Sequence, residues 1–165
     1  MKTAIAIGLL LAASTALAEP LRTVQDPARK RVWVLEVDAV YLQEGNRRQR
    51  FELPGWVHAK DIYACTPDLA VDAQGAVVVT SNVVPVVWRI EPATAQVTRH
   101  ELALDADLDK EVGFTSITYA RHQRAFYAFS ATYGSVWRID SQLNRAQKIR
   151  QLDAPARECL PASSL

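Results

Sequence analysis

Val87-Trp88-Arg89-Ile90-Glu91 is one of three copies of a short pattern, and the other two are Val32-Trp33-Val34-Leu35-Glu36 and Val136-Trp137-Arg138-Ile139-Asp140. The pattern alternates β-branched or aromatic residues with charged ones, which predicts an extended strand with one buried face. The tryptophans are 55 and 49 residues apart, a spacing that suits a four-stranded unit better than a helical repeat. Such a unit cannot bury its apolar face alone. The repeats therefore predict an all-β protein of stacked antiparallel sheets.

Two of the three repeats are predicted to be complete. The central repeat, residues 66–104, and the last repeat, residues 115–151, each contain short extended segments separated by turn residues, as a four-stranded antiparallel sheet requires. The first repeat, residues 32–54, is predicted to be incomplete, with the tryptophan strand and one partner strand around Phe51. The three tryptophans are expected at equivalent strand positions, where they pack between sheets.

The central repeat carries a family resemblance. Its run Leu69-Ala70-Val71-Asp72-Ala73-Gln74-Gly75-Ala76-Val77-Val78-Val79-Thr80, followed by the strand around Trp88, resembles the blades of secreted β-propellers. The similar groups are the NHL-like and gluconolactonase-like six-bladed propellers and the WD40/quinoprotein-like superfamily. The resemblance covers residues 68–151 well and the preceding part loosely. It implies four-stranded antiparallel blades, but it does not select a function, because this architecture hosts lactonases, lyases, dehydrogenases and binding modules.

The number of repeats leaves the assembly open. The sequence predicts about two and a half blades, whereas a closed propeller has roughly four to eight. The chain is therefore expected to be a partial propeller, either an open or fragmentary array or one completed by association of several copies into a homo-oligomer. An open array would expose strand edges and apolar faces.

The first residues predict export. Lys2, the apolar run of residues 4–13 and the small residues of Ala16-Leu17-Ala18 form the pattern of a signal peptide over residues 1–18. The apolar run is too short to span a membrane, so no membrane insertion is expected after cleavage. The sequence thus predicts a repeat domain at 19–155 and a tail at 156–165 in a bacterial periplasmic or extracellular protein.

The two cysteines, Cys65 and Cys159, predict a disulfide within the chain, because exported proteins retain such bonds. Two free thiols or a bond between chains are the alternatives. Neither cysteine belongs to a Cys-x-x-Cys pattern, so metal and redox chemistry are not expected at either sulfur.

The charge balance excludes a nucleic-acid footprint. The chain has 19 basic residues, one of them Lys2 in the leader, and 18 acidic residues, which offers no excess of cations for phosphate binding. Two local basic runs, Arg29-Lys30-Arg31 and Arg47-Arg48-Gln49-Arg50, are interpreted as solvated turns or strand ends.

Two sets of oxygen ligands are weak metal candidates. The alternating Asp105, Asp107 and Asp109 resemble the start of a calcium loop, but the following residues lack its glycine and glutamate. Resemblance to gluconolactonase-like hydrolases, which hold a divalent metal on the axis, points to Asp68 and Asn82, although no matching glutamate was found. No cofactor is predicted beyond this weak possibility of a divalent cation such as Ca²⁺.

No complete catalytic constellation is present in the sequence, so the predicted function is an exported, non-catalytic binding or scaffolding module. Its partner would be a protein or small-molecule ligand of the cell envelope. Trp56, outside the repeated pattern and after Pro54-Gly55, is the candidate binding residue. The alternative is a metal-dependent hydrolase of the gluconolactonase-like class, so whether the protein is an enzyme stays open.

Overall fold

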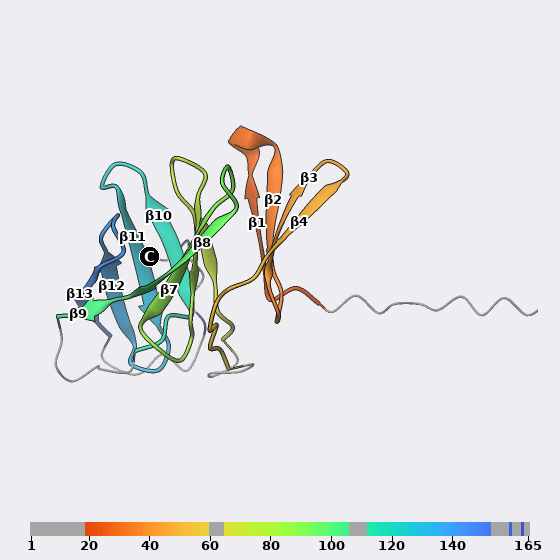
Figure 1. The fold of residues 1–165 in the computed structure, drawn as a ribbon. Coiled ribbons are helices and arrows are strands. Elements are labelled where there is room, and N and C mark those ends of the chain that lie inside the picture. The colour runs from red at the N-terminus through yellow and green to blue at the C-terminus, as the bar shows by residue number, and fades with distance from the viewer. Residues whose placement is uncertain (1–18, 60–64, 106–111, 153–158, 160–162, 164–165) are drawn as a thin grey trace, which may run out of the picture.

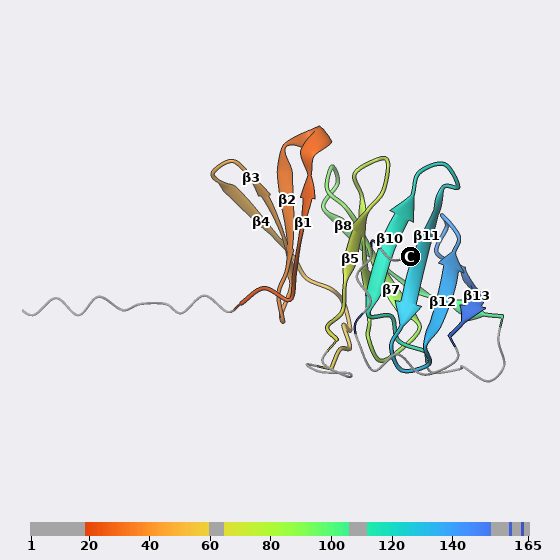
Figure 2. The same cartoon turned by 180° about the vertical axis from the view of Figure 1, so that it is seen from behind.

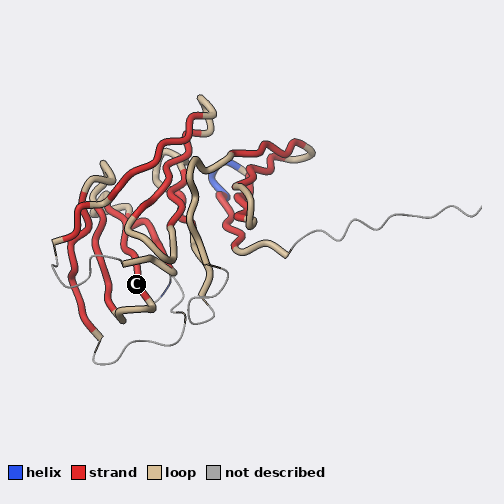
Figure 3. Tube along the Cα trace, turned by 60° about the horizontal axis from the view of Figure 1, so that its bottom comes forward, coloured by secondary structure: helices blue, strands red, loops and turns tan. Residues whose placement is uncertain are grey.

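The computed structural model describes residues 19–59, 65–105, 112–152, 159 and 163, and almost all of its regular structure is β (Figure 3). The described strands form three sheets that stand side by side in chain order (Figure 1). The predicted all-β, propeller-type class is confirmed. The segment predicted as a signal peptide, residues 1–18, and most of the predicted tail lie outside the described residues. No described helix is long and apolar enough to cross a membrane.

Each sheet contains four antiparallel strands that lie in sequence order. The first sheet contains β1 (Arg22–Asp26), β2 (Arg31–Leu35), β3 (Val40–Glu44) and β4 (Arg47–Phe51), and a short 3-10 turn, Pro27–Arg29, follows β1. The second contains β5 (Leu69–Val71), β6 (Val77–Thr80), β7 (Val86–Glu91) and β8 (Gln96–Glu101). The third contains β10 (Ser116–Ala120), β11 (Ala125–Ser130), β12 (Ser135–Ile139) and β13 (Arg145–Gln151).

The third sheet gains a fifth strand from the preceding connection. β9 (Ala103–Leu104) leaves the end of the second sheet and pairs in parallel with β13, so that β9 forms the outer edge of the third sheet. The connection thereby ties two neighbouring sheets together at their outer edges.

The first repeat is a complete sheet, so the prediction of an incomplete blade at residues 32–54 was wrong. Four residues separate β1 from β2, with Lys30 in the left-handed region at φ 53°, and only Gly45 and Asn46 separate β3 from β4. Because these turns are so short, four strands of five residues fit between Arg22 and Phe51. The sequence-based prediction gave too few strands because it assumed longer strands and turns than the first sheet contains.

The innermost strands of the sheets are β1, β5 and β10, and β5 contacts both of the others. The hairpin turns after the first and third strands of every sheet lie at one end of the molecule, at the top of Figure 1 and of the reverse view in Figure 2. We call this the hairpin end, and the opposite end, where chain passes between sheets, the connection end.

The core is formed by the apolar faces of adjacent sheets. Trp33 and Trp88 are fully buried between the first and second sheets, and Trp137 is fully buried between the second and third. The middle sheet is apolar on both faces, since Val77 and Val79 face one core and Val78 faces the other. This confirms the prediction that the repeated tryptophans pack between sheets.

The tryptophans do not, however, occupy equivalent strands. Trp33 lies on β2, the second strand of its sheet, whereas Trp88 and Trp137 lie on β7 and β12, the third strands. A strand with one buried face shows the same alternation in either place, so the pattern alone did not distinguish them.

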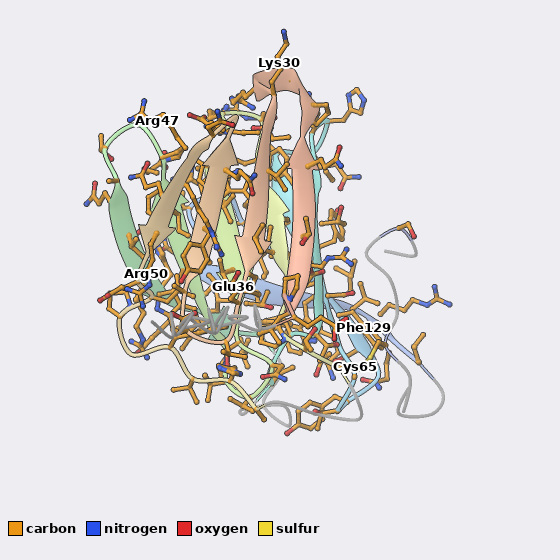
Figure 4. The ribbon with its side chains drawn as sticks, turned by 90° about the vertical axis from the view of Figure 1, so that its right-hand side faces the viewer. Lys30, Glu36, Arg47, Arg50, Cys65 and Phe129 are labelled. Atoms are coloured by element: carbon orange, nitrogen blue, oxygen red, sulfur yellow. A yellow bond between two sulfur atoms is a disulfide. The ribbon has the colours of Figure 1, made fainter. Side chains whose placement is uncertain are left out.

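The predicted disulfide is present: Cys65 is bonded to Cys159, with their Cα atoms 5.4 Å apart. Cys65 is buried against Phe129 and Val136 of the third sheet, at the connection end (Figure 4). The bond therefore joins the entry to the second sheet with a residue beyond the last strand, and closes a loop across 94 positions.

We expect replacement of Trp88 or Trp137 by alanine to lower the free energy of unfolding by about 3 to 5 kcal/mol, because each leaves a large cavity between two sheets. Trp56 is only partly buried, so Trp56→Ala should have a much smaller effect. Urea unfolding of the three variants side by side is the measurement. Equal, small losses would contradict the assignment of Trp88 and Trp137 to the core.

Reduction of the disulfide should lower the free energy of unfolding by up to about 5 kcal/mol, the chain-entropy value for a loop of this length. Urea midpoints with and without dithiothreitol test this. The Cys65→Ser, Cys159→Ser double variant is the control, since its midpoint should match that of the reduced protein and should not respond to dithiothreitol. An unchanged midpoint on full reduction would refute the expectation.

Candidate ligand groove along the inner strands

A hollow of about 250 Å³ runs along the inner strands and is the candidate ligand site. Backbone and side chains of β1, β5 and β10 line it, so all three sheets contribute to its wall. We call it the axial groove. Its lining residues are Arg22, Val24, Gln25, Asp26, Pro27, Leu69, Ala70, Val71, Asp72, Ile117, Thr118, Tyr119 and Arg121.

Asp68 joins the three sheets at the connection end of the groove. Arg22 at the start of β1 donates from Nε to Asp68 Oδ1 over 2.9 Å. The backbone N–H of Leu69 donates to the same oxygen over 2.8 Å, and that of Ile117 on β10 donates to Oδ2 over 3.0 Å. One buried carboxylate therefore accepts hydrogen bonds from all three innermost strands.

Burial determines the protonation of Asp68. Desolvation raises the pKa of this carboxyl, and the Arg22 charge and the N–H groups of Ile117 and Leu69 lower it by less. The net pKa lies above the usual value for aspartate, so the carboxyl takes up a proton at a higher pH than an exposed aspartate does.

At the hairpin end of the groove, Asp72 closes the turn between β5 and β6. Its Oδ1 accepts hydrogen bonds from the backbone N–H groups of Gln74 and Ala76, each at 2.9 Å. Its Oδ2 accepts from Arg89 at 2.7 Å. Burial lowers the pKa of Arg89, but the hydrogen bonds with Glu91 and Asp72 raise it by more, so the net pKa is raised. The guanidinium therefore stays charged and neutralises Asp72.

Asp26 holds the first sheet against the second. It accepts from Arg31 Nε at 2.9 Å, and the same guanidinium donates to the carbonyl of Gly75 at 2.6 Å. Arg29 donates to the carbonyl of Ala73 at 2.8 Å. Gly75 adopts φ +90°, and an added Cβ would meet both arginine side chains.

The basic run at residues 29–31 is thus not simply a solvated turn, as the sequence suggested. Arg31 is buried and bridges two sheets, whereas Lys30 at the tip is exposed (Figure 4). The second run lies on the exposed outer strand β4, where Arg48 stacks on Tyr41 at 3.9 Å and pairs with Glu36.

Where the structure describes them, the predicted metal ligands are engaged in separate contacts. Asp68 contacts residues that line the groove. The Asn82 side chain instead donates to the carbonyls of Ala59 and Cys65, on the connection between β4 and β5. Asp105 accepts a hydrogen bond from the backbone N–H of Lys148, and Asp107 and Asp109 lie outside the described residues. Among the described residues, no cluster of three or more His, Cys, Asp or Glu side chains could hold a metal.

Trp56, the predicted binding residue, is not part of the groove. Its ring stacks on His58 at 4.2 Å and packs against the core between the first and second sheets. It lies on the connection between β4 and β5. Its role in binding stays a prediction.

Sequence reasoning missed the residues that give the groove its polarity. Arg22, Tyr119 and Arg121 lie on or beside the inner strands, and nothing in a single strand shows that it is innermost. The order of strands within each repeat was the available signal, since the first strand of a propeller blade is the innermost one.

Comparison with known proteins places the fold but not the activity. No protein-family model and no curated protein matches the sequence. Among solved structures, a catalytically inactive virginiamycin B lyase from Staphylococcus aureus with quinupristin matches with a TM-score of 0.63 and 14% identity, over 87% of this chain and 44% of that chain. Hydrazine synthase from Kuenenia stuttgartiensis matches with a TM-score of 0.55 and 12% identity, over 87% and 40%.

These matches show a propeller-type fold alone, because the sequence identity is so low. This chain spans less than half the length of either of those two chains. The matched part of each of those chains corresponds to the three sheets of this one.

We expect Asp68→Ala to lower the free energy of unfolding by about 2 to 5 kcal/mol, because it leaves buried N–H groups on β5 and β10 without an acceptor. Arg22 is 43% exposed, so Arg22→Gln should lower it by less than about 1 kcal/mol. Urea unfolding at neutral pH compares the two variants. Equal losses would mean that Asp68 acts only through its exposed ion pair.

Proposed function

We propose that this protein is an exported, non-catalytic binding module whose ligand lies in the axial groove. The observation that carries the proposal is that the aspartates in and beside the groove already join the sheets. Asp26, Asp68 and Asp72 are all buried, and each accepts hydrogen bonds from neighbouring strands or turns.

This use of the carboxylates argues against the hydrolase alternative. A metal ion or a reacting proton needs a carboxylate lone pair that faces the substrate. Both oxygens of Asp68 accept hydrogen bonds from N–H donors, and these three bonds occupy most of the lone pairs that a metal ion would use. Binding makes no such demand on Asp68.

The remaining groove side chains suit recognition of a polar ligand. Gln25 and Thr118 supply amide and hydroxyl groups, and Tyr119 supplies a partly buried ring with a hydroxyl. Pockets that hold small ligands combine a few such polar groups with apolar wall. The apolar wall here includes Leu69, Ala70 and Val71, the three residues of β5.

Two features support export as part of the proposal. The Cys65–Cys159 disulfide is of the kind that persists in oxidising compartments. Residues 1–18 have the pattern of a signal peptide.

A thermal-shift screen of small polar metabolites, followed by calorimetry of the hits, tests the groove. Gln25→Ala and Thr118→Ala should weaken binding at least about tenfold, since each removes a hydrogen-bonding group from the wall. Gln43→Ala, at an exposed position of β3, is the matched control and should leave the affinity unchanged. Equal affinities for all three variants would place the ligand elsewhere.

The hydrolase alternative predicts a different outcome. Elemental analysis of protein purified without added metal would find a stoichiometric divalent cation, and a lactone would be hydrolysed until a chelator is added. We expect neither result, and either one would contradict a purely binding role.

A further inference from the structure

The hairpin end of the axial groove carries positive charge that the neighbouring acids do not balance. The four residues of the turn between β10 and β11, 121–124, are exposed and include Arg121 and Arg124. Arg121 lines the axial groove. Arg124 lines a second hollow, of about 230 Å³, between the second and third sheets.

The two hollows are neighbours. Asp72 and Tyr119 line both of them. The β10–β11 turn contributes Arg121 to one hollow and Arg124 to the other. Gln74 and Ser141 add an amide and a hydroxyl to the second hollow. We call this combined region, at the hairpin end of the groove, the groove mouth.

The acids at the groove mouth already have basic partners. Asp26 pairs with Arg31 and Arg29, and Asp72 pairs with Arg89. In the part of the chain that the structure describes, neither Arg121 nor Arg124 forms an ion pair. The mouth therefore has two exposed guanidinium groups beside acids that are internally neutralised.

We propose that Arg121 and Arg124 bind an anionic group, a carboxylate or a phosphate, of a small ligand seated in the axial groove. The inference rests on the proposed binding function and adds the charge class of the ligand. A guanidinium matches either anion because it presents paired N–H donors in one plane. Tyr119 and Gln74 supply further polar groups at the same place.

The two exposed arginines also affect the local electrostatic potential. The whole chain is close to neutral, so an unbalanced pair at the mouth creates a local positive potential without a basic surface overall. Such a potential raises the rate at which anionic ligands arrive and decreases with added salt.

Calorimetry of the full chain with citrate and with pyrophosphate tests the proposal, and mannitol serves as a neutral probe. We expect at least one of the two anions to bind, with an affinity that decreases as salt is added. The anion that binds more tightly, citrate or pyrophosphate, identifies a carboxylate or a phosphate as the preferred group. The Arg121→Gln, Arg124→Gln double variant should bind it at least about tenfold more weakly, because charge-assisted hydrogen bonds are lost.

Arg47→Gln and Arg150→Gln are the matched controls. Both residues are exposed arginines, Arg47 at the hairpin end of β4 and Arg150 on β13, and neither lines the groove mouth. They should leave anion binding unchanged. Because all four arginines are exposed, circular dichroism and the melting temperature should be the same for every variant.

Two outcomes would overturn the inference. If the double variant binds the anion as well as the two control variants do, the anion sits elsewhere. If neither anion binds while a neutral ligand still binds in a Thr118-dependent manner, the mouth does not select anions and the groove function stands. Failure of every groove variant to alter any binding would instead remove the proposed function itself.

Discussion

Burial of apolar sheet faces against one another is the constraint on which the rest of this structure depends. A four-stranded sheet with one bare apolar face is not stable in water, and three sheets in a row solve this by sharing two cores. The middle sheet is accordingly apolar on both faces. Trp33, Trp88 and Trp137 are the largest fully buried side chains among the described residues, and each packs in a core between two neighbouring sheets.

Stacking the sheets brings their innermost strands together and creates a second problem, which polar side chains solve. Inner strands leave backbone N–H groups close to one another, and a buried N–H without an acceptor is costly. Asp68 accepts from the inner strands of all three sheets, and Asp26 and Asp72 anchor arginines at the other end of the groove. The same contacts occupy the carboxylate oxygens, whereas Arg121 and Arg124 of the β10–β11 turn are exposed.

The outward face of the first sheet differs from the buried faces. Arg48 lies over the ring of Tyr41, and Arg50 pairs with Asp38 and with Glu52, so polar side chains cover the sheet where a further apolar neighbour would have to pack (Figure 4). Repeat arrays commonly carry such polar faces on their terminal units. Charged side chains along β4, the outermost strand of this sheet, also discourage pairing with another strand.

The sequence by itself predicted the fold class, the burial of the repeated tryptophans and the Cys65–Cys159 bond. These depend on alternation within one strand, or on the chemistry of two cysteines, and both are local properties. Only the tertiary structure decided that the first repeat is complete, that Trp33 lies on a second strand, and that Arg31 and Asp68 bridge sheets. Asp68 and Ile117 are 49 positions apart, about one repeat, and a hydrogen bond across that separation leaves no periodic trace in the sequence. The groove likewise could not be predicted from the sequence, because its residues become neighbours only when the sheets stack.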